Sequence, residues 1–155
     1  MPHGDYEMTD IRTADYVILM KDEIRGLFTD IYPDYPEIAD RLCYDPALRD
    51  HVVTKVAYSG GTIVGQANIF FHKDLDGNAN LGFHVHPSMR GRGIATALSH
   101  EAIEDARSKG ISLLFIRTRE DNSAAIAVAG KLGFGRDDSR FAQAGLAIFK
   151  KQLSR

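Results

Sequence analysis

Two arginines and two glycines stand together in the stretch Arg90-Gly91-Arg92-Gly93. A glycine has no Cβ, so it can turn the chain sharply and bring backbone N–H groups close to a ligand. From Ile94 onward, apolar residues recur at helical spacing, which places these glycines just before a helix N-terminus. Unpaired N–H groups and the positive end of the helix dipole attract anions there, and the arginines add positive charge. The pattern predicts a loop that binds phosphate or pyrophosphate.

Two common phosphate-binding patterns do not fit this loop. A dinucleotide fingerprint needs a third glycine where the chain has Thr96, and a P-loop needs Gly-Lys-Ser/Thr after four spacer residues. The segment from Arg90 to Ala95 does resemble the Arg/Gln-x-x-Gly-x-Gly/Ala signature of the Gcn5-related N-acetyltransferase (GNAT) family. The preceding strand and two later elements also resemble that family, at its usual spacing: Gly82–Pro87, Asn122–Ala125 and Lys131–Phe134. The similarity covers about residues 80 to 135, and an ordinary glycine turn is the alternative.

The resemblance implies a fold and a donor. The fold is α/β, with a mixed, mostly antiparallel sheet flanked by about four helices in a single domain spanning residues 1–155. The sheet is splayed where the strand before the loop meets the strand after the long helix, and acetyl-coenzyme A lies in that opening. The residues expected to contact the coenzyme are Phe83, Val85, Arg90, Gly91, Arg92, Gly93, Ile94, Ala95, Asn122 and Lys131. Backbone N–H groups near Val85 are the expected oxyanion and pantetheine partners.

The implied chemistry is direct acetyl transfer to an amine, which must lose a proton before it attacks the thioester. The chain departs from the family twice, with Asn80 where many relatives carry a glutamate and Ala129 where many carry the tyrosine that protonates the thiolate. We expect His84 or His86 to replace the base, because imidazole titrates near neutral pH and alternate strand residues share a face. Glu120, acting through water, is a second candidate. A packed or hydrogen-bonded scaffold role is the alternative for each histidine.

The acceptor is predicted from charge and from one loop. Residues 1–50 contain 12 acidic and 5 basic residues, whereas the rest of the chain is net basic. If both parts border one cleft, the acidic part suits a cationic acceptor, although a solvated acidic face is an equal alternative. In the family, the region near the start helps to shape the acceptor pocket. The candidate acceptor contacts are therefore Tyr32, Asp34, Tyr35 and Glu37, which could equally form a rigid surface loop.

Composition excludes several classes of function. No apolar run approaches the ~20 residues of a membrane helix, and the N-terminus lacks the pattern of a signal peptide. Cys43 is the only cysteine, which rules out an internal disulfide, favours packing over catalysis and suggests the cytoplasm. Nucleic acid is not expected as a partner, because no dense basic run with aromatics appears. No metal is expected either, since Asp74, Asp76 and Asn78 lack the glutamate of a calcium loop.

The order of elements follows from periodicity and turn signals. The expected helices run from Thr13 or Asp15 to Phe28, from Ile38 to Leu48, from Ile94 to Lys109, and from Asn122 or Ser123 to Gly133. The expected strands are Tyr6–Ile11, Val52–Tyr58, Thr62–Phe71, Ala79–His86, Ile111–Thr118, Gly135–Arg140 and Leu146–Lys150, with a hairpin at Ser59-Gly60-Gly61.

Together these observations predict an N-acetyltransferase that moves the acetyl group of acetyl-coenzyme A to a primary amine. The acceptor is a small, cationic molecule or a protein, and a homodimer is left open. Because of Asn80 and Ala129, an alternative stays open: a non-catalytic sensor of acyl-coenzyme A. A third reading is an interaction module that uses the fold alone and binds no coenzyme.

Overall fold

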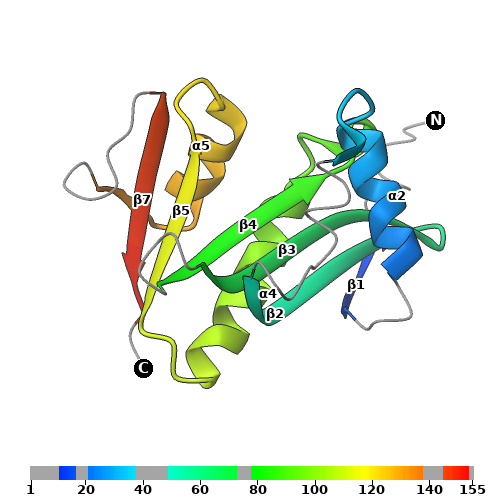
Figure 1. Ribbon diagram of the computed structural model, residues 1–155. Coiled ribbons are helices and arrows are strands. Elements are labelled where there is room, and N and C mark those ends of the chain that lie inside the picture. Colours follow the sequence, from blue (N-terminus) through cyan, green and yellow to red (C-terminus); the bar gives the residue numbers. More distant parts are fainter. Residues whose placement is uncertain (1–10, 17–20, 38–48, 73–77, 138–144, 154–155) are drawn as a thin grey trace.

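The computed structural model describes residues 11–16, 21–37, 49–72, 78–137 and 145–153. Seven strands form one sheet in the order β1-β2-β3-β4-β5-β7-β6 (Figure 1). Their bounds are β1 Ile11–Asp15, β2 Arg49–Ser59, β3 Thr62–His72, β4 Ala79–Val85, β5 Leu113–Arg119, β6 Gly135–Arg136 and β7 Leu146–Gln152. Within these ranges there are three α-helices, α2 Lys21–Ile31, α4 Ile94–Ser108 and α5 Ser123–Lys131, and one 3-10 helix, η3 Pro87–Met89.

The sheet is mixed and mostly antiparallel, as predicted. Strands β1 to β4 pair antiparallel, and so do β5, β7 and β6. The two groups join through the parallel pair β4 and β5, whose register among the described residues is a single position, Asn80 opposite Phe115. Beyond that position the two strands diverge, and the sheet opens into a wedge (Figure 1). The predicted splay is therefore present between these two strands.

The hairpin between β2 and β3 confirms the turn predicted at Ser59-Gly60-Gly61. Gly60 and Gly61 both have positive φ, 57° and 84°, as a tight two-residue hairpin turn requires. Two register shifts between β2 and β3 were not foreseen, one between His51 and Val53 and one beside this turn. The register moves from Ala57–Gly65 to Tyr58–Ile63, so β3 carries one extra residue there. Because side chains alternate along a strand, this bulge reverses the faces on either side of it. It lets Gly65 face α4 while Ile63 packs in the cluster around α2.

Helix α4 covers one face of the sheet with the stripe of apolar residues predicted from its spacing. Ile94, Leu98, Ala102 and Ala106 are all at most 5% exposed. The helix sits close to β3 because Gly65 has no side chain: a Cβ there would lie 3.0 Å from Ile94 Cγ2. This close approach fixes the first turn of α4, and with it the end of the glycine loop, against the sheet.

Helix α2 covers the opposite face and begins later than predicted. The helix expected to start at Thr13 or Asp15 is wrong in its first part, because both residues lie in β1, opposite Ala57 and Lys55 of β2. Pairing across the sheet overrides the local helical spacing there. From Lys21 on, the expected helix is present, and it buries Ile24, Leu27 and Phe28 against β2 and β3.

The remaining boundaries differ only in detail. Strand β5 starts two residues after Ile111, and β7 runs two residues past Lys150. Asn122 caps α5 as expected, its Oδ1 accepting the N–H of Ala125 at 3.1 Å. Several predicted segments lie outside the described residues: the helix Ile38–Leu48, Cys43, most of the first strand, residues 73–77 and the end of Gly135–Arg140. Within the described residues, no helix combines the length and apolar character needed to cross a membrane.

Candidate functional site

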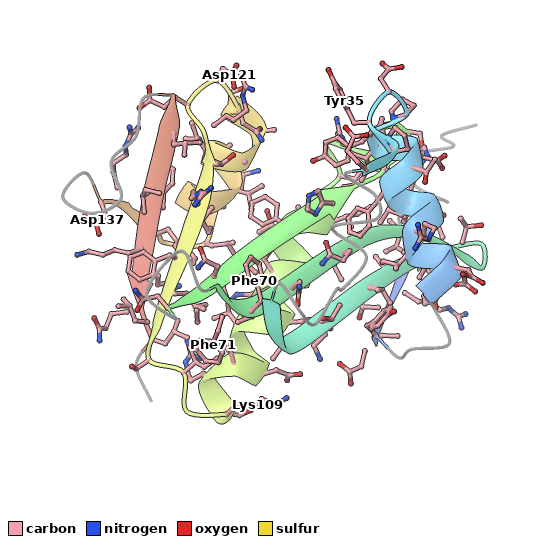
Figure 2. All side chains as sticks on the ribbon, in the orientation of Figure 1. Tyr35, Phe70, Phe71, Lys109, Asp121 and Asp137 are labelled. Atoms are coloured by element: carbon pink, nitrogen blue, oxygen red, sulfur yellow. The ribbon has the colours of Figure 1, made fainter. Side chains whose placement is uncertain are left out.

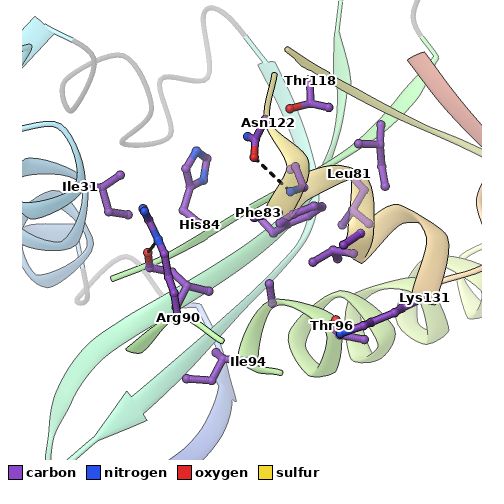
Figure 3. A pocket seen from close by; sticks show the side chains of 18 of the residues that line it. Ile31, Leu81, Phe83, His84, Arg90, Ile94, Thr96, Thr118, Asn122 and Lys131 are labelled. Carbon is purple, nitrogen blue, oxygen red and sulfur yellow. Dashed lines mark hydrogen bonds between the residues drawn. The ribbon is translucent and has the colours of Figure 1, made fainter. Parts of the chain in front are cut away.

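A pocket of about 700 Å³ fills the wedge between β4 and β5. Its walls come from the end of α2, strands β4 and β5, the glycine loop with the start of α4, and α5 (Figure 3). Nine of the ten residues predicted to contact the coenzyme line it: Phe83, Val85, Arg90, Gly91, Gly93, Ile94, Ala95, Asn122 and Lys131. Arg92 is half-buried and is not part of the lining.

The glycine loop has the geometry of an anion site. Gly91 and Gly93 adopt positive φ of 78° and 79°, a conformation that disfavours any side chain with a Cβ. Gly93 is the N-cap of α4 and has no side chain with which to bond the first N–H groups of that helix. A Cβ at either glycine would meet nothing within 4 Å, so the backbone stands open to the pocket. These N–H groups and the helix dipole can therefore bind phosphate oxygens.

Two basic residues predicted to contact the coenzyme lie at different ends of the pocket. Lys131 of α5 points toward Thr96, in the first turn of α4 (Figure 3). The guanidinium of Arg90 instead extends away from the loop, between Ile31 and His84. Its Nε donates a hydrogen bond to the carbonyl oxygen of Val85 at 3.1 Å. The sequence placed both residues at the coenzyme but could not fix where their side chains point.

His84 is the predicted base that the structure brings into the pocket. Its Nδ1 lies 3.1 Å from Oε1 of Gln66, a residue only 3% exposed. A carboxamide oxygen only accepts, so His84 Nδ1 donates and the lone pair of the neutral ring is on Nε2. The ring also packs edge-on against Phe28, with centroids 5.1 Å apart, and lies 6.1 Å from the Tyr32 ring. The imidazole is thus held in one tautomer and one orientation, as a general base requires.

The other two predicted bases lie outside the lining. His86 Nδ1 accepts the backbone N–H of Ser88 at 3.1 Å, which caps η3, and its Nε2 lies 3.2 Å from Asp30 Oδ2. Both ring nitrogens of His86 are therefore engaged by neighbouring residues of the fold. Glu120 follows β5 and accepts a hydrogen bond at 2.6 Å from Arg136 of β6. Of the three candidates, His84 is therefore the one that lines the described pocket.

The two positions that depart from the family pattern also lie outside the lining. Asn80 is 2% exposed, sits at the root of the wedge and donates a hydrogen bond to the Asn78 carbonyl oxygen at 3.2 Å. Ala129 is fully buried in the main core cluster.

Of the four predicted acceptor contacts, only Tyr32 lines the pocket. Burial raises the pKa of its phenol, and the positive charge of Arg90 partly offsets that rise. Tyr35 is 56% exposed and projects outward from the loop after α2 (Figure 2). Asp34 and Glu37 are exposed as well. The loop thus contributes one side chain to the pocket, and its acidic residues face solvent.

Sequence reasoning missed the wall formed by the end of β5. Ile116, Arg117, Thr118 and Arg119 all line the pocket. Arg119 is paired with Asp121, its Nε and Nη2 each 3.1 Å from a carboxylate oxygen. The available signal was positional: this strand follows the long helix, and the resemblance already placed its end opposite the glycine loop.

Comparisons with known proteins agree with this geometry. A sequence model described as the acetyltransferase (GNAT) family matches residues 17–134. The chain is 34% identical over 105 residues to an acetyltransferase of Yersinia pestis (strain Pestoides F), covering 66% of this chain and 68% of that one. The GNAT domain of S. lividans PAT superimposes with a TM-score of 0.74 at 18% identity, covering 92% and 90% of the two chains. The structure of yncA from Salmonella typhimurium, which contains acetyl-CoA as its cofactor, gives 0.68 at 17% identity over 94% and 95%.

Proposed function

Because the chain belongs to the acetyltransferase (GNAT) family, we propose that it transfers the acetyl group of acetyl-coenzyme A to a primary amine. The observation that carries this proposal is the pocket in the wedge, which connects an anion-binding helix N-terminus to the oriented imidazole of His84. A donor with a diphosphate and a thioester needs both features, one to hold the phosphates and one near the reacting carbon.

The coenzyme end of the pocket fits the diphosphate. No atom lies within 4 Å of the Cβ positions of Gly91 and Gly93, so a diphosphate has room to approach their backbone N–H groups, and Lys131 adds a positive charge beside the first turn of α4. Asn122 lines the same pocket but already uses its Oδ1 to cap α5, which leaves its side-chain amide as the donor. These groups hold the donor so that its thioester reaches β4. The backbone N–H groups near Val85 are the proposed partners of the developing oxyanion.

His84 is the proposed general base. The amine must lose a proton as it attacks the carbonyl carbon, and His84 Nε2 carries the lone pair that can take it. Gln66 Oε1 accepts from Nδ1–H throughout, so it stabilises the imidazolium that forms. The thiolate that departs needs little help from an acid. Tyr32 keeps its proton because burial raises its pKa, and it can donate a hydrogen bond in the same pocket.

The proposed acceptor is a primary amine of a small molecule or a protein. The acidic residues that suggested a cationic acceptor do not support it in the described part of the pocket, since Asp34 and Glu37 lie outside the lining. The residues that line the pocket are therefore the better guide to the charge of the acceptor. We also propose a cytoplasmic location, which fits a chain with one cysteine in 155 residues.

Two measurements test the proposed function. Calorimetry with acetyl-coenzyme A and desulfo-coenzyme A measures donor binding, and release of free thiol with a panel of amines measures transfer. Binding together with thiol release is the expected result. Tight binding with no release on any amine would instead support the sensor, which Asn80 keeps as the second candidate because its side chain cannot accept a proton. No binding of either compound would support an interaction module.

A further inference from the structure

The charged side chains that line the described pocket are all basic. They are Arg90, Arg117, Arg119 and Lys131, and no carboxylate among the described residues joins them. Arg119 is already paired with Asp121. Lys131 lies at the coenzyme end, near Thr96, whereas Arg90 lies at the other end, near His84 (Figure 3). The positive charge therefore extends beyond the part of the pocket that would hold phosphates.

The position of Arg90 is fixed by the backbone of β4. Its Nε donates to the Val85 carbonyl oxygen, so one edge of the guanidinium is held against the end of the strand. The other edge is directed between Ile31 and His84. The electrostatics of Tyr32 also place the positive charge at this end. Burial raises the pKa of the Tyr32 phenol, and the charge of Arg90 partly offsets that rise. Tyr32 follows α2, with its ring centroid 6.1 Å from that of His84.

This arrangement does not suit a phosphate ligand. The N–H groups at the start of α4 lie beyond the loop, and Arg90 turns its guanidinium toward α2 instead of toward them. Among the described residues, the only hydrogen bond formed by the Arg90 side chain uses Nε, which leaves its Nη groups available to a ligand in the pocket that Arg90 lines. A planar guanidinium with two such N–H groups matches a carboxylate, which it can bind through two parallel hydrogen bonds.

We propose that Arg90 binds a carboxylate of the acceptor and so selects amines that also carry an anionic group. This inference rests on the proposed function and specifies its substrate class. A carboxylate on the Nη groups of Arg90 holds the acceptor between Arg90 and His84. The amine then lies next to the ring that takes its proton, and Tyr32 closes the same end of the pocket. α-Amino acids and peptides with an acidic side chain near the amine have the required chemistry.

Matched pairs of amines test the proposal. In each pair a carboxylate is exchanged for a carboxamide of similar size: α-amino acids against their carboxamides, and glutamyl dipeptides against glutaminyl ones, with rates compared at equal concentrations of the neutral amine. A charge-assisted hydrogen bond to a carboxylate is worth enough to give the acid a kcat/KM about 10- to 100-fold above its amide. In Arg90→Gln this ratio should fall toward one, with the Kd of acetyl-coenzyme A nearly unchanged by calorimetry. Arg90→Lys keeps the positive charge but loses the two parallel N–H donors of the guanidinium, so its ratio should lie between those of the wild type and Arg90→Gln.

Lys131→Gln is the control at the other end of the pocket. It should raise the Kd of acetyl-coenzyme A and leave the ratio between acid and amide as in the wild type. The proposal is overturned if the wild type shows no preference for the acids, if Arg90→Gln keeps the preference, or if Arg90→Gln weakens coenzyme binding as much as Lys131→Gln does. Thiol release without a preference overturns this inference alone, whereas no release with any amine overturns the proposed function with it.

Discussion

Replacing Gly65 by alanine tests whether the close contact between α4 and β3 positions the glycine loop. The new Cβ would lie 3.0 Å from Ile94 Cγ2 and 3.2 Å from Leu98 Cδ1, shorter than ordinary contact distances. Both neighbours are at most 5% exposed, so they have little room to move. Overpacking of this kind costs about 1–3 kcal/mol. Removing a glycine from a strand returns about 0.5–1 kcal/mol.

The net loss of unfolding free energy should therefore be roughly 0.5–2 kcal/mol. In a domain of this size that lowers Tm by roughly 1–8 °C, measured by thermal unfolding with circular dichroism. Gly65→Val adds two more methyl groups at the same contact and should lower Tm further. Because Ile94 is the first residue of α4 and lines the pocket, Gly65→Ala should also raise the Kd of acetyl-coenzyme A in calorimetry.

Gly26→Ala is the matched control. Gly26 lies in the middle of α2, and a Cβ there would meet nothing within 4 Å. The same chemical change should stabilise this helix by up to about 1 kcal/mol. The reasoning fails if Gly65→Ala unfolds at the wild-type temperature and binds the coenzyme normally, or if both variants shift Tm in the same direction by the same amount.

Three further predictions concern the base, the loop and an ion pair. His84→Ala should remove the dependence of the acetylation rate on pH near neutrality, whereas His86→Ala should keep it and lose stability only; wild-type profiles in both variants would dismiss the imidazoles. Gly93→Asp should raise the Kd of acetyl-coenzyme A at least about tenfold, since a charge-assisted interaction becomes a repulsion, while Gly93→Asn, of similar shape and uncharged, should raise it less; equal values would remove the loop from the anion site. The hydrogen bond and charge of Lys55 lower the pKa of Asp15, so this pair stabilises the fold above about pH 4 and loses its effect as the pH falls through the lowered pKa. Asp15→Asn should be less stable than wild type at pH 7 by about 0.5 kcal/mol or less, because the carboxylate is 74% exposed, and equally stable once the pH lies well below the lowered pKa; a constant difference at both pH values in urea unfolding would contradict this.

Local signals were sufficient where a residue's conformation depends on its near neighbours. The hairpin glycines, the apolar stripe of α4 and the cap at Asn122 were all predicted correctly for that reason. Thr13 and Asp15 were placed in a helix because their pairing with β2 joins residues about 40 positions apart. The bulge in β3 was missed for a related cause: its extra residue serves the packing of Gly65 under α4, which no local pattern shows.

The site could be predicted in outline but not in the direction of its side chains. Alternation along β4 put His84 and His86 on one side, and both rings do lie toward α2. The two histidines differ because of the turn after β4, where the backbone N–H of Ser88 bonds the His86 ring. Alternation along the strand does not predict that contact. The same limit applies to Arg90, whose motif suggested phosphate, whereas its side chain bonds the Val85 carbonyl oxygen and points toward His84 (Figure 3).

The divergence of β4 and β5 has a consequence for handling the protein. Past Asn80 and Phe115 the register between the strands does not continue in the described residues, so each presents main-chain amides to the open wedge. Such interior edges can pair with any extended segment, including one from a partly unfolded neighbour. A coenzyme bound in the wedge, as proposed, would cover them. Saturating donor should therefore slow aggregation during storage and heating even in variants that no longer turn over.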